Sequence, residues 1–132
     1  MSIKTIVTSF ADFILLEEGI IIIKFTFEGE LALDQGMEIF RITVELSEGK
    51  KHSLIYDFNH NNIIFSQEIK QGAQSRNPLD DLLVSRSFVC YSLSNKLEVN
   101  HFIKFNKPSS PTQLFNSIEE ALAWSKIKLS KT

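Results

Sequence analysis

The stretch DFILLEEGIIIIKFTF, residues 12–27, sets the fold of this chain. Two runs of β-branched and aromatic residues flank the short segment Glu17, Glu18 and Gly19. Runs of this composition favour strands, and glycine tolerates the positive φ angle that a tight turn requires. The stretch therefore predicts a β-hairpin, and the rest of the chain is expected to add to the sheet that it begins.

Helices and strands are predicted to alternate after this hairpin. From Leu33 onward, Leu33, Met37, Phe40 and Val44 recur at intervals of three and four residues, which places them on one face of a helix. Gly49 is predicted to end this helix. The further predictions are a strand at 52–58, a helix from Ser66, an interruption at Pro78, a strand at 87–93, a helix at 94–106, a strand at 112–115 and a last helix capped by Ser117.

This order of elements predicts an α/β fold in a single domain, residues 1–132. We expect the N-terminal β-hairpin, then alternating helices and strands, with a mixed sheet of about five strands packed by helices. A chain of 132 residues is long enough to bury one core and too short for two ordinary domains.

Composition argues against several classes of function. The net charge is −2 and the basic residues are scattered, so we expect no binding of nucleic acid. The longest purely apolar run is Ile20–Ile23, which is too short for an integral membrane segment. Cys90 is the single cysteine, and the N-terminus lacks the pattern of a signal peptide. We therefore expect a cytoplasmic protein.

No pattern in the sequence points to an enzyme or to a cofactor. His52 and His60 flank one predicted strand at a distance too great to share a metal ion, and His101 belongs to another element. Cys90 lies within a predicted strand without an activating neighbour, and there is no nucleophile-elbow or glycine-rich phosphate motif. We expect no metal, no cofactor and no catalytic residue.

One polar arrangement suggests a switch. Asp57 stands near the end of a predicted central strand, and Ser66 stands at the start of the next helix. Ligands of open α/β sheets favour the carboxyl ends of strands, and a phosphate at a helix N-terminus meets free N–H groups. Ser66 is therefore a candidate phosphoacceptor. An ordinary helix cap explains the same serine, so both interpretations stay open.

The C-terminal stretch FNKPSSPTQLFNSIEEALAW, residues 105–124, carries a family resemblance. It resembles the pattern of small bacterial proteins related to STAS domains, the fold of anti-sigma-factor antagonists, and the likeness covers residues 10–129. The resemblance implies a STAS-like sheet and a non-enzymatic role in protein recognition. Phosphorylated members carry Asp-Ser-Ser at a helix start, and the matching triplet here is Phe65, Ser66 and Gln67, in which one serine is retained.

Three hypotheses for function follow. The first is a regulatory module that binds an unknown protein partner through the surface around this loop: Asp57, Asn59, His60, Asn61, Asn62, Phe65, Ser66 and Gln67. The second is a small-molecule or lipid carrier, because STAS-like sheets resemble the CRAL-TRIO lipid-binding architecture and the chain has 11 phenylalanines. The third is a homodimer, if the apolar segment 20–27 forms an exposed edge strand.

Overall fold

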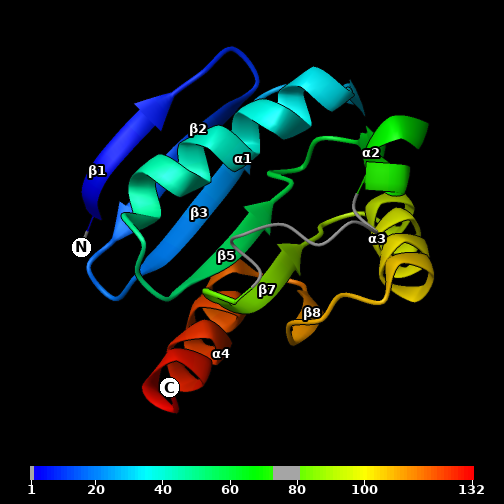
Figure 1. The fold of residues 1–132 in the computed structure, drawn as a ribbon. Coiled ribbons are helices and arrows are strands. Elements are labelled where there is room, and N and C mark those ends of the chain that lie inside the picture. The colour runs from blue at the N-terminus through cyan, green and yellow to red at the C-terminus, as the bar shows by residue number, and fades with distance from the viewer. Residues whose placement is uncertain (1, 73–80) are drawn as a thin grey trace.

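The computed structural model describes residues 2–72 and 81–132, and these residues form one mixed sheet, a second small sheet and helices on both faces of the larger one (Figure 1). The strands are β1 (Ser2–Val7), β2 (Ala11–Leu16), β3 (Ile20–Phe25), β4 (Gly29–Leu31), β5 (His52–Asp57), β6 (Ile63–Phe65), β7 (Leu83–Val89) and β8 (Thr112–Phe115). The helices are α1 (Leu33–Ser47), α2 (Gln67–Gly72), α3 (Leu93–Asn106) and α4 (Ile118–Ser130).

The larger sheet has the order β1-β2-β3-β5-β7-β8. The pairs β1–β2 and β2–β3 are antiparallel, whereas β3–β5, β5–β7 and β7–β8 are parallel. The short strands β4 and β6 form a separate parallel pair. The predicted α/β class and mixed sheet are confirmed. Within the described residues the sheet has six strands, and β1 is the one that the sequence pattern did not reveal.

The predicted hairpin is present and lies inside the sheet. Gly19 has a φ angle of 89° in the turn, and its N–H donates to the carbonyl of Leu16 at 3.1 Å. β3 pairs with β2 on one side and with β5 on the other. Its backbone groups are therefore satisfied, so the segment 20–27 does not offer the exposed edge on which the homodimer hypothesis depended.

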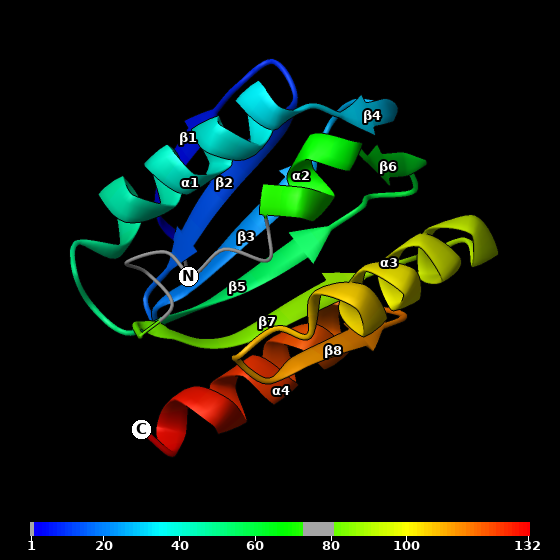
Figure 2. The same ribbon diagram turned by 45° about the vertical axis from the view of Figure 1, so that its right-hand side comes forward.

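The two faces of the sheet are covered differently. Figure 2 shows α1 over β2 and β3, with α2 and α3 on the same side, whereas α4 packs against the opposite side (Figure 1). We call these the three-helix face and the α4 face. Alternate residues of each strand point to opposite faces. Thus Leu54 packs into the large cluster under α1 and α3, and its neighbour Ile55 packs into the smaller cluster under α4.

Helix α1 begins at the predicted residue but turns a different side toward the sheet. Ile39, Ile42 and Leu46 are buried, whereas Met37 is 63% exposed and Val44 is also exposed. The helix ends where Glu48 adopts a left-handed conformation with φ 50°, one residue before Gly49. The recurring apolar face that predicted this helix is therefore mostly outside the core.

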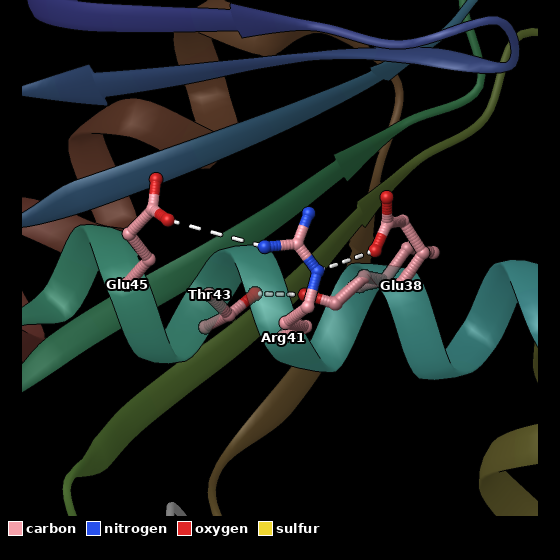
Figure 3. Close-up of polar contacts among 5 residues, drawn as sticks. Glu38, Arg41, Thr43 and Glu45 are labelled. Carbon is pink, nitrogen blue, oxygen red and sulfur yellow. Dashed lines mark hydrogen bonds and ion pairs between the residues drawn. The ribbon is translucent and has the colours of Figure 1, made fainter.

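Charged residues form a short network on α1. The Arg41 Nε donates to Glu38 Oε1 at 2.6 Å, and the Arg41 Nη1 lies 3.9 Å from Glu45 Oε1 (Figure 3). On the buried side, the Thr43 hydroxyl donates to the carbonyl of Ile39 at 2.8 Å. The arginine pairs belong to the solvent-exposed surface and contribute little to stability. The threonine bond satisfies a hydroxyl that has no access to water.

Two further element boundaries differ from the sequence prediction. The strand expected at 87–93 is β7, which starts at Leu83 and stops at Val89, because Ser92 already caps α3 by accepting from the Asn95 N–H at 3.1 Å. Ser117 caps α4 as predicted, by accepting from the Glu120 N–H at 3.2 Å. Ile127, placed on the core stripe of α4, is exposed instead. The interruption predicted at Pro78 lies outside the described residues.

No helix within residues 2–72 and 81–132 combines the length and the apolar character needed to cross a membrane.

Candidate functional site

The loop predicted as the functional surface closes the carboxyl end of β5. The Asp57 Oδ1 accepts from the Asn59 N–H at 2.9 Å, and both Asn59 and His60 have positive φ angles. The Asn61 Nδ2 donates to the carbonyl of Phe25 at 3.0 Å, which ties the loop to the end of β3. Asparagine and aspartate suit such a turn because their short side chains bond to nearby backbone groups.

Asp57, Tyr91 and His60 form a small cluster beside this loop. Burial raises the pKa of Asp57, while the Asn59 N–H, Lys24 and a hydrogen bond with Tyr91 oppose that shift. The pKa of Tyr91 is also raised, mainly by burial and then by the nearby Asp57 charge. The His60 ring stacks on Tyr91 at 4.0 Å between centroids. The cluster holds the loop in place and leaves His60 exposed at the surface.

Three of the predicted surface residues are inside the molecule. Asp57 is 7% exposed, Phe65 is a buried residue of β6, and Ser66 is 3% exposed. The Ser66 Oγ accepts from the Ile69 N–H at 3.2 Å, as an ordinary cap of α2 does. Phosphorylation of Ser66 stays a prediction. Because the Ser66 hydroxyl is buried and bonded to the Ile69 N–H, the helix cap must open before a kinase can reach it.

A cavity lies elsewhere, on the three-helix face. It has a volume of about 600 Å³ and sits over β5 and β7 between α1, α2 and α3. Its described lining comes from the sheet, from all three helices and from the segment that follows α3. The lining residues are Leu31, Leu33, Gly36, Met37, Ile39, Phe40, Thr43, His52, Leu54, Tyr56, Phe65, Ile69, Gly72, Leu83, Arg86, Phe88, Phe102, Asn106, Lys107, Pro108, Ser109 and Ser110. This size is typical of small-molecule sites.

Aromatic side chains line the part of the cavity nearest the carboxyl ends of the strands. The rings of Tyr56 and Phe88 stack across β5 and β7 with centroids 5.1 Å apart. Phe65 and Phe102 meet at 5.0 Å, and each also lies against Phe88. This group forms a rigid apolar wall. A hydrocarbon that packs against such a wall buries apolar surface, and the rings lose little further freedom because they already pack against one another.

Arg86 is the unusual residue of the cavity floor. It occupies the middle of β7, opposite Leu54 on β5 and Thr112 on β8. Internal strands of parallel sheets are normally apolar, since both faces are covered. The Arg86 Nε is buried and has no hydrogen-bond partner, and no ion pair joins Arg86 to another described residue. Arg86 is only partly buried, so its charge keeps some contact with water, but the unpartnered Nε and the missing ion pair leave it able to bind an anion.

His52 adds a second unpartnered atom to the same end of the cavity. The ring is 1% exposed, and its Nδ1 lies 2.9 Å from the carbonyl of Lys50. A carbonyl only accepts, so Nδ1 carries the hydrogen and Nε2 is an acceptor without a partner. Burial lowers the pKa of His52, which keeps the ring neutral at pH 7. The bond from Nδ1 opposes this shift but is the smaller cause.

Asn106 and Lys107 complete this polar end. The Asn106 Nδ2 donates to the carbonyl of Phe102 at 3.0 Å, which leaves its Oδ1 buried and unpartnered. Lys107 ends α3 in a left-handed conformation and stands exposed at the rim. The described lining contains two cationic residues, Arg86 and Lys107, and no carboxylate. The cavity therefore has an aromatic end and an electropositive end.

Sequence reasoning missed Arg86 because it placed the start of β7 at residue 87. The available signal was an arginine inside the run LVSRSFV, where an internal strand of a parallel sheet should be apolar. His52 was weighed only as a metal ligand and rejected. Among residues 2–72 and 81–132 there is no group of three His, Cys, Asp or Glu side chains placed to hold a metal ion.

Cys90 is buried directly after the end of β7. Burial raises the pKa of its thiol to about 12, so the thiol is protonated at neutral pH.

These features define a single α/β domain with a ligand-sized cavity on one face of its sheet. The chain belongs to the family described as a domain of unknown function (DUF7793), whose model matches residues 14–127. A crystal structure of a protein of unknown function from Arthrobacter sp. FB24 is similar at 17% sequence identity and a TM-score of 0.33. That match covers 91% of this chain and 92% of the other. No curated protein matches.

Proposed function

We propose that this protein binds a small, largely apolar molecule in the cavity of the three-helix face and performs no chemistry on it. The observation that carries the proposal is the conjunction of a cavity of about 600 Å³ with three buried polar atoms that lack partners: His52 Nε2, Arg86 Nε and Asn106 Oδ1. Buried polar groups are nearly always paired in folded proteins. Three exceptions around one cavity support a missing ligand better than three separate defects.

Thr43→Leu is the variant that tests this proposal. Thr43 is a buried residue of α1 and is part of the cavity lining. A leucine at this position should therefore reduce the cavity volume without adding charge. Thr26→Leu is the matched control, because Thr26 is exposed and does not line the cavity. An organic extract of the purified protein is first analysed by mass spectrometry for a copurified ligand. Any bound ligand is then removed from the remaining protein on a hydrophobic resin.

Titration with Nile red, a neutral apolar dye, then reports binding. We expect one dye molecule per chain in the wild type and in Thr26→Leu, and binding at least tenfold weaker in Thr43→Leu. Absence of dye binding by the stripped wild type, together with an empty extract, contradicts the proposal. Equal binding by all three proteins also contradicts it, because the dye would then occupy another surface.

A second candidate is the protein-recognition role predicted from the sequence, and an exposed apolar patch favours it. Leu93 and Leu97 are both largely exposed on α3, one turn apart. The Ser92 hydroxyl, beside Leu93, lies 3.5 Å from the Asn62 Oδ1, so this patch adjoins the exposed part of the loop. His60, Asn62 and Gln67 remain on that surface. A bacterial, cytoplasmic, STAS-like regulator using it stays a prediction.

Photo-crosslinking separates this candidate from background association. A photoreactive phenylalanine analogue replaces Leu97 in one variant and Lys126, exposed on α4, in a control. The candidate predicts a discrete crosslinked protein from position 97 alone in cells that express the chain naturally. The same products from both positions, or none from position 97, count against it.

A further inference from the structure

The charges and unpartnered atoms of the cavity also restrict the chemical class of its occupant. Resting on the proposed function, we propose that the ligand is an amphipathic carboxylic acid, with its carboxylate at Arg86 and its apolar body against the aromatic wall. The wall is the group Tyr56, Phe65, Phe88 and Phe102.

Orientation follows from the strand register. His52 is the first residue of β5 and Arg86 lies opposite Leu54, two residues further along that strand. Tyr56 lies opposite Phe88, two residues further again on both strands. Side chains two residues apart on a strand point to the same face, so polar and aromatic residues follow one another along a single row. The cavity is therefore polar at one end and aromatic at the other, as an amphipathic ligand requires.

The sign of the head group follows from the charges. Arg86 and Lys107 are cationic, the His52 ring is neutral, and the described lining supplies no carboxylate to balance them. A cationic head group would meet like charge at Arg86. A carboxylate instead matches the planar fork of donors of a guanidinium, which forms two parallel hydrogen bonds to its two oxygens. It would also neutralise the partly buried charge of the β7 arginine.

The two acceptor atoms fit the same arrangement. His52 Nε2 and Asn106 Oδ1 carry no hydrogen, so they can only accept hydrogen bonds. A guanidinium has five N–H donors, and a bidentate carboxylate uses two of them, so these two atoms can accept from the donors of Arg86 that remain. Either contact would hold the guanidinium in the orientation that binds the acid.

Three ligands with the same ten-carbon chain test the head group: decanoate, 1-decanol and decylamine. Each displaces Nile red from the stripped wild-type protein at pH 7.5 and low salt. We expect decanoate to bind at least tenfold more tightly than 1-decanol, and decylamine to bind most weakly. Arg86→Gln should remove the preference for decanoate while 1-decanol still binds, because glutamine keeps polarity and loses charge. Lys104→Gln, an equal change of net charge on the exposed side of α3, should behave as the wild type.

The results distinguish the two proposals. If none of the three ligands binds and Nile red also fails, the cavity is not a binding site and the proposed function falls. If 1-decanol or decylamine binds as well as decanoate, the cavity binds ligands but the assignment of an acid is wrong. Retention of the preference for decanoate in Arg86→Gln also overturns it. Circular dichroism of each variant shows whether a loss reflects misfolding, and a misfolded Arg86→Gln is replaced by Arg86→Lys. In that case the preference should weaken, because an ammonium forms no bidentate contact.

Discussion

The α4 face and the three-helix face belong to the same sheet, but their side chains are packed differently. Under α4, the small residues Ala121 and Ser125 are both fully buried and let the helix approach the sheet. The neighbouring strand residues Ser53 and Ser85 bond to each other at 2.7 Å. On the three-helix face, by contrast, large aromatic side chains surround a cavity of about 600 Å³. The same sheet therefore has one closely packed side and one side that borders a cavity.

Unpartnered atoms occur on both faces, but their character differs. Ser87 and Ser125 have buried hydroxyls without partners in the described structure, on the α4 face. A neutral hydroxyl costs much less to leave unpaired than a guanidinium does. The two faces therefore differ mainly in the partly buried, unpartnered charge of Arg86, which has no counterpart among the described residues of the α4 face.

The largest effect is expected from adjacent residues of β5 that point to opposite faces. Ile55→Ala should lower the free energy of unfolding by about 3–4 kcal/mol, because its neighbours on the closed face cannot fill the new space. Leu54→Ala should cost about 2 kcal/mol, since that side chain already borders a cavity and loses fewer contacts. Urea denaturation measures both. Equal losses would mean that the two faces are packed alike.

Enlarging a small buried helix residue should show the same asymmetry, with the larger loss of stability again on the α4 face. Ser125→Leu on α4 should destabilise the protein by about 1–3 kcal/mol, because the closed face has no room for added methyl groups. Thr43→Leu should change stability by less than about 1 kcal/mol, since the side chain enters the cavity and its burial offsets the lost bond to Ile39. Thermal unfolding of both variants provides the measurement. A greater loss for Thr43→Leu than for Ser125→Leu would contradict the comparison.

The pH dependence of stability should report the burial of His52. Its pKa is lowered in the folded state from the ordinary 6.5, so between these two values the unfolded chain binds more protons than the folded chain does. Stability should therefore be intact above pH 6.5 and fall as the pH drops below that value toward the folded pKa. His52→Gln should remove this component and flatten the curve of unfolding free energy against pH between 7 and 5. An unchanged curve would place the titration elsewhere.

The smallest effect is expected at the surface of α1. Arg41→Gln removes the contacts with Glu38 and Glu45, which are all solvent-exposed. Such pairs gain little in water and lose most of that gain in salt. The midpoint of thermal unfolding should stay within error of the wild type in 0.15 M salt, with Nile red binding unchanged. A clear loss of stability would show that α1 depends on its outer charges as well as on its buried side.

Local signals predicted the elements of the fold better than the faces they present. The turn at Gly19, the cap at Ser117 and the composition of β8 each depend on a few neighbouring residues, and all were found from the sequence. The apolar periodicity correctly predicted the helix α1. The side of α1 that is buried depends on strands that lie elsewhere in the chain, so the sequence pattern did not predict it. β1 was missed because five of its six residues are exposed and give no alternating pattern.

The candidate site was harder to predict because its residues come from distant elements. Residues of the loop after β5 were grouped by their proximity in sequence, and the fold buried Phe65 and Ser66 among them. Arg86, His52 and Asn106 are spread over 55 positions of the sequence and meet only when β5, β7 and α3 assemble. Neither charge nor spacing in the chain indicates that meeting.

The order of the strands has a consequence for how the protein reaches its native state. The antiparallel β2–β3 pairing closes over a turn of a few residues, whereas the parallel β5–β7 pairing that floors the cavity joins residues about 30 positions apart. Local contacts form quickly, and long loops must lose entropy before their contacts stabilise the chain. We therefore expect the N-terminal hairpin to gain protection from hydrogen exchange first during refolding. The cavity proposed to bind a ligand would then be among the last parts of the molecule to form.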